Sequence, residues 1–166
     1  DKLGKNDEYL VINMMTPHNK WTIHSTWSDN LMMLTLGRGG PVAWLSEKDA
    51  ARISLKDNDW VEVINSNGAS VARLIVSQRV PENALIMYHN SERTVNMPVN
   101  QVNGNRGGVH NSVERICLKP THMIGGYAQL SYGLNYYGTI GSNRDEFVIL
   151  RKLNRVEWKD EASPEQ

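Results

Sequence analysis

Cysteine is nearly absent from this chain, since Cys117 is the only one among 166 residues. A single thiol excludes an internal disulfide and any zinc or iron–sulfur site built from clustered cysteines within these residues. Cys117 stands between Ile116 and Leu118, so we expect a buried structural thiol. It has no activating neighbours in the sequence and no GxSxG motif occurs, so nucleophilic catalysis has little support.

Long apolar runs are also missing. No segment approaches the roughly 20 apolar residues needed to cross a bilayer, and no signal-peptide pattern is present. The chain begins at Asp1 rather than Met, a hint that it is a piece of a longer protein. Lys plus Arg and Asp plus Glu each number 18, which gives a formal net charge of zero. Nothing in the global charge favours nucleic acid or an anionic membrane, so any anion site must be local.

Short apolar runs between turn signals are the main structural pattern. The size and the 40% apolar composition suit one domain. Asn67-Gly68 predicts a hairpin between two of the runs, and Ser46 to Asp49 resembles a capping box that starts a short helix. The segment 31–36 fits either a helix or a strand, and Met and Trp residues are expected to fill the core. From 91 to 141 Gly and Asn dominate, which is typical of long functional loops. The expected strands are 9–13, 41–45, 60–64, 69–76, 84–89 and 144–153, which together favour a small β-barrel or sandwich.

The loop from Thr16 to Ser25 is the strongest candidate site. It holds two imidazoles, one ammonium and three hydroxyls directly after an expected strand. His18 and His24 are six residues apart, and neither an HExxH motif nor a carboxylate–histidine cluster accompanies them, so we expect no protein-bound metal. Such loop histidines suit hydrogen bonds to a polar ligand instead.

No other motif supplies a catalyst. The glycine-rich turns match neither GxGxxG nor GxxxxGK[ST], although their backbone N–H groups can still face a phosphate. The acidic pairs Asp57/Asp59 and Asp145-Glu146 are interpreted as turn and surface residues. The residues alone therefore predict a β-rich domain with a polar, histidine- and glycine-lined ligand surface.

Several long motifs together resemble one known family. From about Tyr9 to Leu153 the chain is similar to the carboxy-terminal domain of the catalytic alpha subunit of respiratory nitrate reductase, in the dimethyl sulfoxide reductase superfamily of molybdoenzymes. The motifs are TPHNKWTIHS (16–25), SDNL (28–31), RGGPVAWLS (38–46), NDWVEVINSNG (58–68), RGGVHNS (106–112), KPTHMIGGY (119–127), NYYG (135–138) and GSNRDEF (141–147).

The resemblance implies a mainly β fold of the α+β kind, a double-psi β-barrel with short helices and long Gly/Asn-rich loops. It divides the chain into a flexible lead-in (1–8), the barrel domain (9–153) and a charged tail (154–166). The barrel would cover a bis(molybdopterin guanine dinucleotide) cofactor with molybdenum. Hydroxyls of the first loop would bind phosphate oxygens, and histidines would contact the pterin or phosphate. The cofactor-binding residues implied are Thr16, His18, His24, Ser25, His89, His110, Asn111, Asn135 and Tyr136.

The same resemblance implies reduction of nitrate to nitrite in anaerobic respiration. The aspartate ligand of molybdenum and the ligands of a 4Fe-4S cluster belong to the earlier part of the subunit, so we expect no catalytic residue and no activity in these residues alone. The implied partners are the remainder of the alpha subunit, an iron–sulfur beta subunit and a haem-bearing membrane gamma subunit, with no nucleic acid and no direct membrane insertion. The cytoplasmic face of the membrane is the default location, unless an export signal directs the enzyme to the opposite face. Two alternatives remain open: a sister enzyme such as nitrite oxidoreductase or perchlorate reductase, and a stand-alone barrel acting as a binding module.

Overall fold

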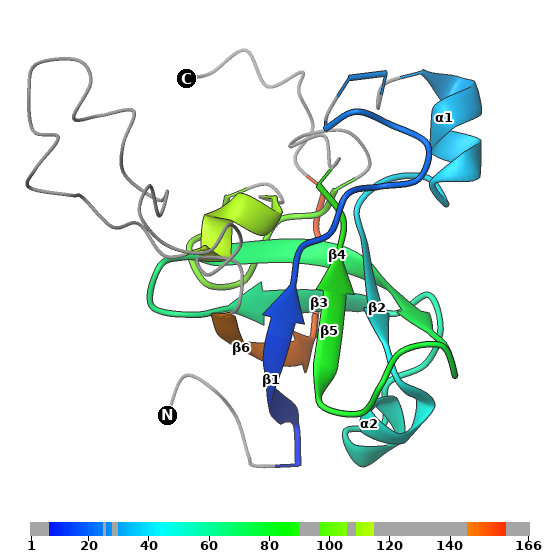
Figure 1. The fold of residues 1–166 in the computed structure, drawn as a ribbon. Helices are drawn as coiled ribbons and strands as arrows, with labels where there is room; N and C mark the ends of the chain where they lie inside the picture. Colours follow the sequence, from blue (N-terminus) through cyan, green and yellow to red (C-terminus); the bar gives the residue numbers. More distant parts are fainter. Residues whose placement is uncertain are drawn as a thin grey trace, which may run out of the picture.

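Six strands close into a barrel in the computed structural model (Figure 1). The model describes residues 7–24, 26–27, 30–89, 97–105, 109–114 and 146–158. Around the barrel the strand order is β1-β5-β2-β4-β3-β6. The strands are β1 (Tyr9–Met15), β2 (Val42–Leu45), β3 (Trp60–Ile64), β4 (Ala69–Val76), β5 (Ala84–Met87) and β6 (Glu146–Lys152).

Parallel and antiparallel pairs are mixed in this barrel. β1 pairs with β5 in parallel, and so does β2 with β4, whereas the four remaining pairs are antiparallel. Closure removes the exposed strand edges that an open sheet of this size would leave. The expected mainly β, double-psi type of barrel is confirmed.

The core lies inside the barrel and follows from the alternation of side chains along each strand. Ile12 and Met14 point inward from β1, where Leu74 of β4, Leu85 of β5 and Leu150 of β6 meet them, all within one buried cluster. Full burial of such a side chain stabilises the fold by roughly 1.5–3 kcal/mol. All six expected strands are present, and their bounds differ from the expected ones by at most two residues. Their in-facing positions are apolar.

One ion pair is buried on the outer face of the barrel. Glu62 of β3 lies directly opposite Arg151 of β6, and its carboxylate accepts from Nη2 of Arg151 at 2.8 Å and from Nε at 2.9 Å. The same carboxylate accepts from the backbone N–H of Gln101. The segment 97–105 is thereby held against the outside of the barrel.

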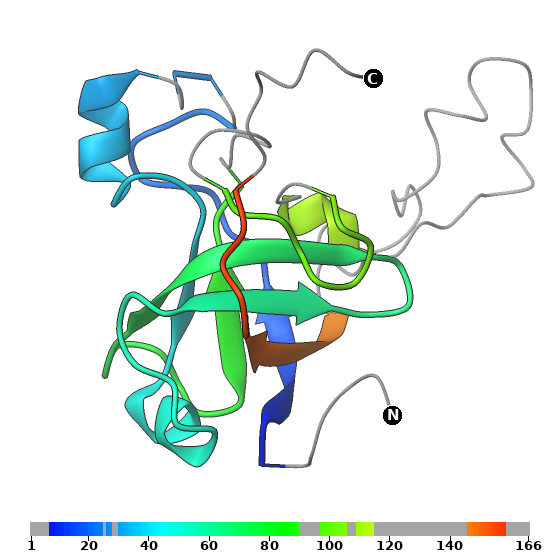
Figure 2. The same ribbon diagram turned by 180° about the vertical axis from the view of Figure 1, so that it is seen from behind.

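The first residues of the expected tail pack against this segment. The N–H of Val99 donates to the carbonyl of Glu157 at 2.7 Å, and the ring of Trp158 meets that of Trp60 edge-on at 5.7 Å. In Figure 2 this stretch crosses β3 and β4 on the back of the barrel. Glu157 and Trp158 therefore contact the barrel and the segment 97–105, although residues 154–158 are all exposed.

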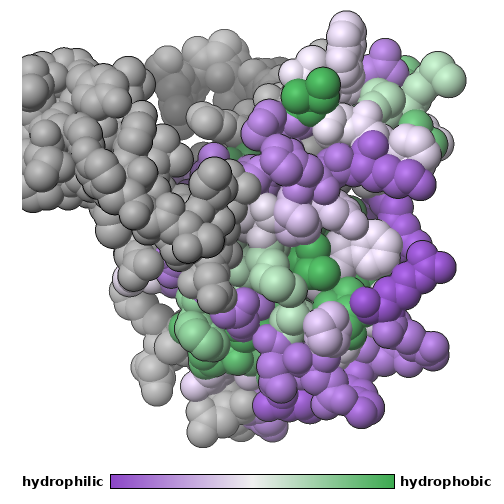
Figure 3. Space-filling view, in the orientation of Figure 1, coloured by the Kyte–Doolittle hydropathy of each residue, from purple (hydrophilic) through white to green (hydrophobic). Residues whose placement is uncertain are grey.

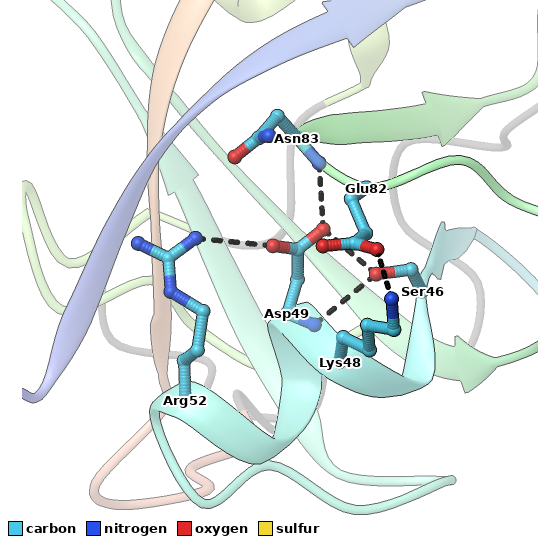
Figure 4. A network of polar contacts seen from close by, with 6 residues as sticks. All are labelled: Ser46, Lys48, Asp49, Arg52, Glu82 and Asn83. Atoms are coloured by element: carbon cyan, nitrogen blue, oxygen red, sulfur yellow. Dashed lines mark hydrogen bonds and ion pairs between the residues drawn. The ribbon is translucent and has the colours of Figure 1, made fainter.

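A short helix, α2 (Glu47–Arg52), covers the end of the barrel between β2 and β3 and begins as its capping pattern predicts. Ser46 accepts from the N–H of Asp49, and the buried carboxylate of Asp49 accepts in turn from the Ser46 hydroxyl and from the N–H of Asn83, both at 2.7 Å. Arg52 adds a contact to Asp49 at 3.1 Å (Figure 4). Hydrophilic side chains gather over this region in Figure 3. The network ties α2 to the turn before β5.

The other helix, α1 (Leu31–Leu36), begins at Asn30, whose side chain accepts from the N–H of Met32, and none of its residues is buried. Both ribbon views show it standing away from the barrel (Figures 1 and 2). The ambiguous segment is thus a helix, and the expectation that its methionines fill the core is wrong, since Met32 is 78% exposed. Among the described residues, no helix is long and apolar enough to cross a bilayer.

Candidate cofactor-binding site

The site lies where two parallel strands end side by side. Met15 of β1 pairs in register with Ile86 of β5, so the loops that follow both strands leave the same end of the barrel. The N–H of His89 donates to the carbonyl of Pro17 at 3.1 Å, which joins the two loops directly. This pairing brings a histidine after β5 to the histidine loop after β1.

Four of the five histidines meet at this end of the barrel. The ring centroids of His18 and His24 are 5.3 Å apart, and each lies near His89, at 5.0 and 5.8 Å. His110 stacks on the other side of His89 at 4.5 Å. His18 and His24 are exposed, whereas His89 and His110 are buried. The fifth histidine, His122, is outside the described residues.

His110 reaches the cluster on a short 3-10 helix, η1 (His110–Val113), which the turn between β3 and β4 supports. The side-chain amides of Asn65 and Asn67 both donate to the carbonyl of Val113. Gly68 approaches η1 so closely that a Cβ there would lie far inside contact distance of the Ser112 carbonyl oxygen. Glycine at this position is therefore needed for η1 to carry His110 to the cluster.

The loop after β1 is itself shaped by local contacts. Asn19 accepts from the N–H of Trp21 at 2.7 Å, a turn of the kind that asparagine favours. Thr26 donates back to Ile23 at 3.0 Å, and between them His24 takes a left-handed backbone with φ of 52°. Such a conformation is uncommon outside glycine, although histidine tolerates it better than most residues. It holds the His24 ring within the cluster.

Of the remaining predicted site residues, two lie in the described part of the chain and three lie outside it. Thr16 is buried, and its hydroxyl donates to Glu114 at 3.2 Å, beside the histidines. Asn111 is exposed on η1. Ser25, Asn135 and Tyr136 lie outside the described residues.

Two participants escaped the sequence reasoning, the carboxylate of Glu114 and the carbonyl of Pro17. Glu114 lies in the long segment that shows no periodicity, and a backbone carbonyl leaves no signal in a sequence. Neither residue carried a pattern that could have revealed it.

His89, His110 and Glu114 each place one potential ligand atom within 4.8 Å of the others, a spacing that a metal ion could bridge. The ring planes of His89 and His110 are only 12° apart, however. Stacked rings point their nitrogen lone pairs side by side, whereas zinc needs nitrogens that converge on one point at about 2.0–2.1 Å. The arrangement is better suited to an extended ligand with several acceptors.

The donor set matches a polar heterocycle or a phosphate. Neutral imidazole offers one donor and one acceptor, and a charged ring offers two donors. Lys20 lies in the same loop, with its ammonium 4.5 Å from the centre of the Trp21 ring. Among the described residues of this site, no pair of carboxylates or activated nucleophile provides a catalytic group.

A closed barrel whose strand ends carry a histidine cluster is a ligand-binding domain, and comparison with known proteins gives its family. A family model described as "Molydopterin dinucleotide binding domain" matches residues 12–130. The chain belongs to this family of molybdopterin dinucleotide-binding domains.

Its relatives are alpha chains of nitrate reductases. The chain is 63% identical over 156 residues to the respiratory nitrate reductase 1 alpha chain of Escherichia coli (strain K12), a match that covers 94% of this chain and 12% of the relative. It is 51% identical to the nitrate reductase alpha chain of Bacillus subtilis (strain 168), with 97% and 13% covered. The chain therefore spans about an eighth of the length of these relatives.

Two more distant proteins are similar to this chain, one in sequence and one in fold. The perchlorate reductase subunit alpha of Dechloromonas aromatica (strain RCB) is 36% identical over 137 residues, with 82% of this chain and 14% of the relative covered. The solved structure of acetylene hydratase from Pelobacter acetylenicus superposes with a TM-score of 0.57 at 14% identity, over 86% of this chain and 18% of that chain. The likeness to acetylene hydratase concerns the fold alone.

Proposed function

We propose that this domain closes over a bis(molybdopterin guanine dinucleotide) cofactor in a subunit that reduces nitrate to nitrite, and that the histidine cluster is its clamp. The observation that carries the proposal is the meeting of His18, His24, His89 and His110 at one end of the barrel. Isolated structural histidines have no reason to gather from three segments of the chain. An extended dinucleotide with pterin, sugar and phosphate parts supplies acceptors and donors for all four.

The residues present suit this group in their chemistry. The exposed rings of His18 and His24 can donate to the pterin or to phosphate oxygens, and the buried rings hold them in place. Ser25 and Thr16 are proposed to bind phosphate, for which the Thr16 hydroxyl must turn from Glu114 to the ligand. Asn111, Asn135 and Tyr136 are proposed as further contacts. The cofactor supplies two-electron redox chemistry, whereas the side chains bind it, orient it and exclude water.

The nitrate relatives support nitrate as the substrate. Six nitrate reductase alpha chains are 46–63% identical to this chain, against 36% for the perchlorate reductase subunit, although a seventh nitrate reductase alpha subunit is only 31% identical. Nitrite oxidoreductase and a stand-alone barrel remain the alternatives. The coding sequence upstream of Asp1 distinguishes our proposal from the stand-alone barrel. Our proposal requires a molybdopterin oxidoreductase region there, and the stand-alone barrel does not.

The remainder of the alpha subunit is the proposed partner of α1 and the loop before it. Within this stretch lie six large apolar side chains that are exposed: Trp21, Ile23, Trp27, Leu31, Met32 and Leu36. In Figure 3 hydrophobic side chains appear at the top right, over α1. An exposed apolar surface this dense marks a contact with another protein surface. It continues from the histidine loop, so one interface would enclose the cofactor and bury these side chains together.

The further assembly is proposed from the family. An iron–sulfur beta subunit and a haem-bearing gamma subunit would complete the enzyme, with a 4Fe-4S cluster elsewhere in the alpha subunit. We place the complex on the cytoplasmic face of the membrane. Residues 9–153 are proposed as the barrel domain between a lead-in and a tail.

The experiment uses the full-length alpha subunit with His18→Ala and His24→Ala, each measured for molybdenum and pterin content as well as for nitrate turnover. Gln78→Ala, an exposed change in the turn after β4, is the matched control. We expect both histidine variants to lose cofactor while the control retains it. Unchanged molybdenum content in both variants would refute the clamp.

A further inference from the structure

A second pocket, of about 250 Å³, opens on the outer face of the barrel. It lies between the turn that follows α1, the start of β3, the middle of β4 and the end of the described segment after β6. None of its residues belongs to the histidine cluster. Its lining residues are Arg38, Gly39, Gly40, Pro41, Trp60, Arg73 and Trp158.

Arg73 lines this pocket, and no ion pair joins it to a carboxylate in the described part of the chain. It lies opposite Trp60 in the β3–β4 pair, and its guanidinium carbon sits 5.1 Å from the centre of the Trp60 ring. Its Nε is buried and has no hydrogen-bond partner among the described residues. A buried donor left unsatisfied destabilises the fold, so it calls for an explanation, such as a group that binds there.

Arg38 brings a second positive charge to the same space. Its backbone is left-handed, with φ of 58°, in the turn that connects α1 to β2. The guanidinium lies 5.9 Å from the ring centre of Trp44 and makes one long ion pair with Asp57, at 3.8 Å. Both side chains of that pair are about half exposed (52% and 46%), so water weakens it. Arg38 thus remains able to bind another anion.

The lining is positive and aromatic, and no carboxylate is among the residues that line the pocket. Arg38 and Arg73 supply two planar guanidinium groups, which match the geometry of carboxylate and phosphate oxygens. Trp60 and Trp158 meet edge-on and form the flat apolar walls. A volume near 250 Å³ is below the roughly 300–1,000 Å³ of pockets for drug-sized ligands, so a ligand with one ring fits best.

We propose that this pocket binds a single-ring aromatic anion, with its carboxylate or phosphate group between Arg38 and Arg73 and its ring against Trp60 and Trp158. Each part of the pocket then has a partner: the anion neutralises the two guanidinium groups, and the ring covers the tryptophans. The site is separate from the cofactor clamp and does not depend on it.

The test is calorimetric titration of the cofactor-loaded, full-length alpha subunit with phenyl phosphate, benzoate, inorganic phosphate and benzyl alcohol. We expect the two aromatic anions to bind, the neutral alcohol not to bind, and inorganic phosphate to bind more weakly than phenyl phosphate. The tighter of the two aromatic anions identifies the charged group that the site prefers. Failure of both aromatic anions to bind, or equal affinity for phosphate and phenyl phosphate, overturns the proposal.

Arg38→Gln and Arg73→Gln should each weaken binding at least about tenfold, because each removes charge-assisted hydrogen bonds. Arg79→Gln is the matched control, since this arginine is exposed in the turn after β4 and does not line the pocket. Trp158→Leu provides a second test in case the Arg73 variant does not fold, because the Trp158 side chain is 53% exposed and can be replaced with less disturbance. It should weaken phenyl phosphate but leave inorganic phosphate unchanged. Unaltered affinity in these three pocket variants contradicts the assignment.

Discussion

His89 and His110 stack face to face, with ring centroids 4.5 Å apart and planes 12° apart, although one follows β5 and the other begins η1. The stack joins a strand end to a short helix in a long segment without regular periodicity. It also forms the buried side of the cluster whose exposed side is His18 and His24. Our proposal thus gives one pair of rings two roles, packing and ligand binding.

These two roles can be separated at His110. His110→Phe keeps an aromatic ring for stacking but removes both nitrogens, whereas His110→Ala removes the ring as well. We expect the Phe variant of the full-length subunit to keep the stacking contribution to its stability while cofactor affinity falls about fivefold, the effect of one lost hydrogen bond of about 1 kcal/mol. The Ala variant should lose about 1 kcal/mol of stability in addition. Molybdenum content and thermal unfolding measure the two effects, and full cofactor retention in the Phe variant would show that the nitrogens do not bind it.

Gly68 tests how η1 is positioned. Gly68→Ala places a methyl group against the Ser112 carbonyl, so η1 must shift or the turn must open. We expect a loss of about 1–3 kcal/mol, the usual cost of overpacking, together with lower molybdenum content in the full-length subunit. Ser66→Ala, an exposed change in the same turn, should leave both quantities unchanged. A Gly68 variant as stable as the Ser66 variant would mean that the close approach is unimportant.

The exposed helix α1 predicts an interface that hydrogen exchange can detect. In the full-length subunit the amides of 31–36 should exchange slowly because another surface covers them. Leu31→Glu removes about 2 kcal/mol of apolar burial, which should raise their exchange about thirtyfold. Val102→Glu, at an exposed apolar residue outside α1, is the control for the added charge. Fast exchange of these amides in the wild-type subunit would contradict the interface.

The lowered pKa of Asp59 predicts that the stability of the fold depends on pH. Partial burial raises the pKa of this carboxyl, but hydrogen bonds from Lys152 and from the N–H of Lys56, with both positive charges, outweigh burial and hold the pKa below its usual 3.8. Its stabilisation is therefore fully present above pH 3.8 and is lost as the pH falls through the lower folded-state value. Lys152→Met should cost about 0.5 kcal/mol near neutral pH and nothing once Asp59 is protonated. Urea unfolding of the full-length subunit measures this, and an equal cost at both extremes would exclude the ion pair as the cause.

The strands could be predicted because their apolar alternation is local. The range 60–64 is confirmed at both ends, and Ser46 caps its helix as expected. Closure of the barrel and the parallel pairing of β1 with β5 could not be predicted, since both join residues far apart in the chain. The exposure of Met32 was missed for a similar reason. The sequence of an apolar helix does not tell whether the helix packs on its own domain or on another one.

The candidate site could likewise be predicted only in part from the sequence. His18 and His24 were identifiable from one loop, and the resemblance to nitrate reductases added His89 and His110. Their assembly into one cluster required the β1–β5 pairing and the support of η1 by Asn65 and Asn67. Glu114 could not be identified, because its role arises from contacts with residues far away in the chain, such as Thr16 and His89.

The most direct test of the clamp is an experimental structure of the full-length, cofactor-loaded alpha subunit at a resolution that shows imidazole contacts. The account predicts ring nitrogens of His18 and His24 within about 2.7–3.2 Å of pterin or phosphate atoms, with His89 and His110 stacked behind them. A cofactor bound elsewhere, with the cluster filled only by protein side chains, would contradict it.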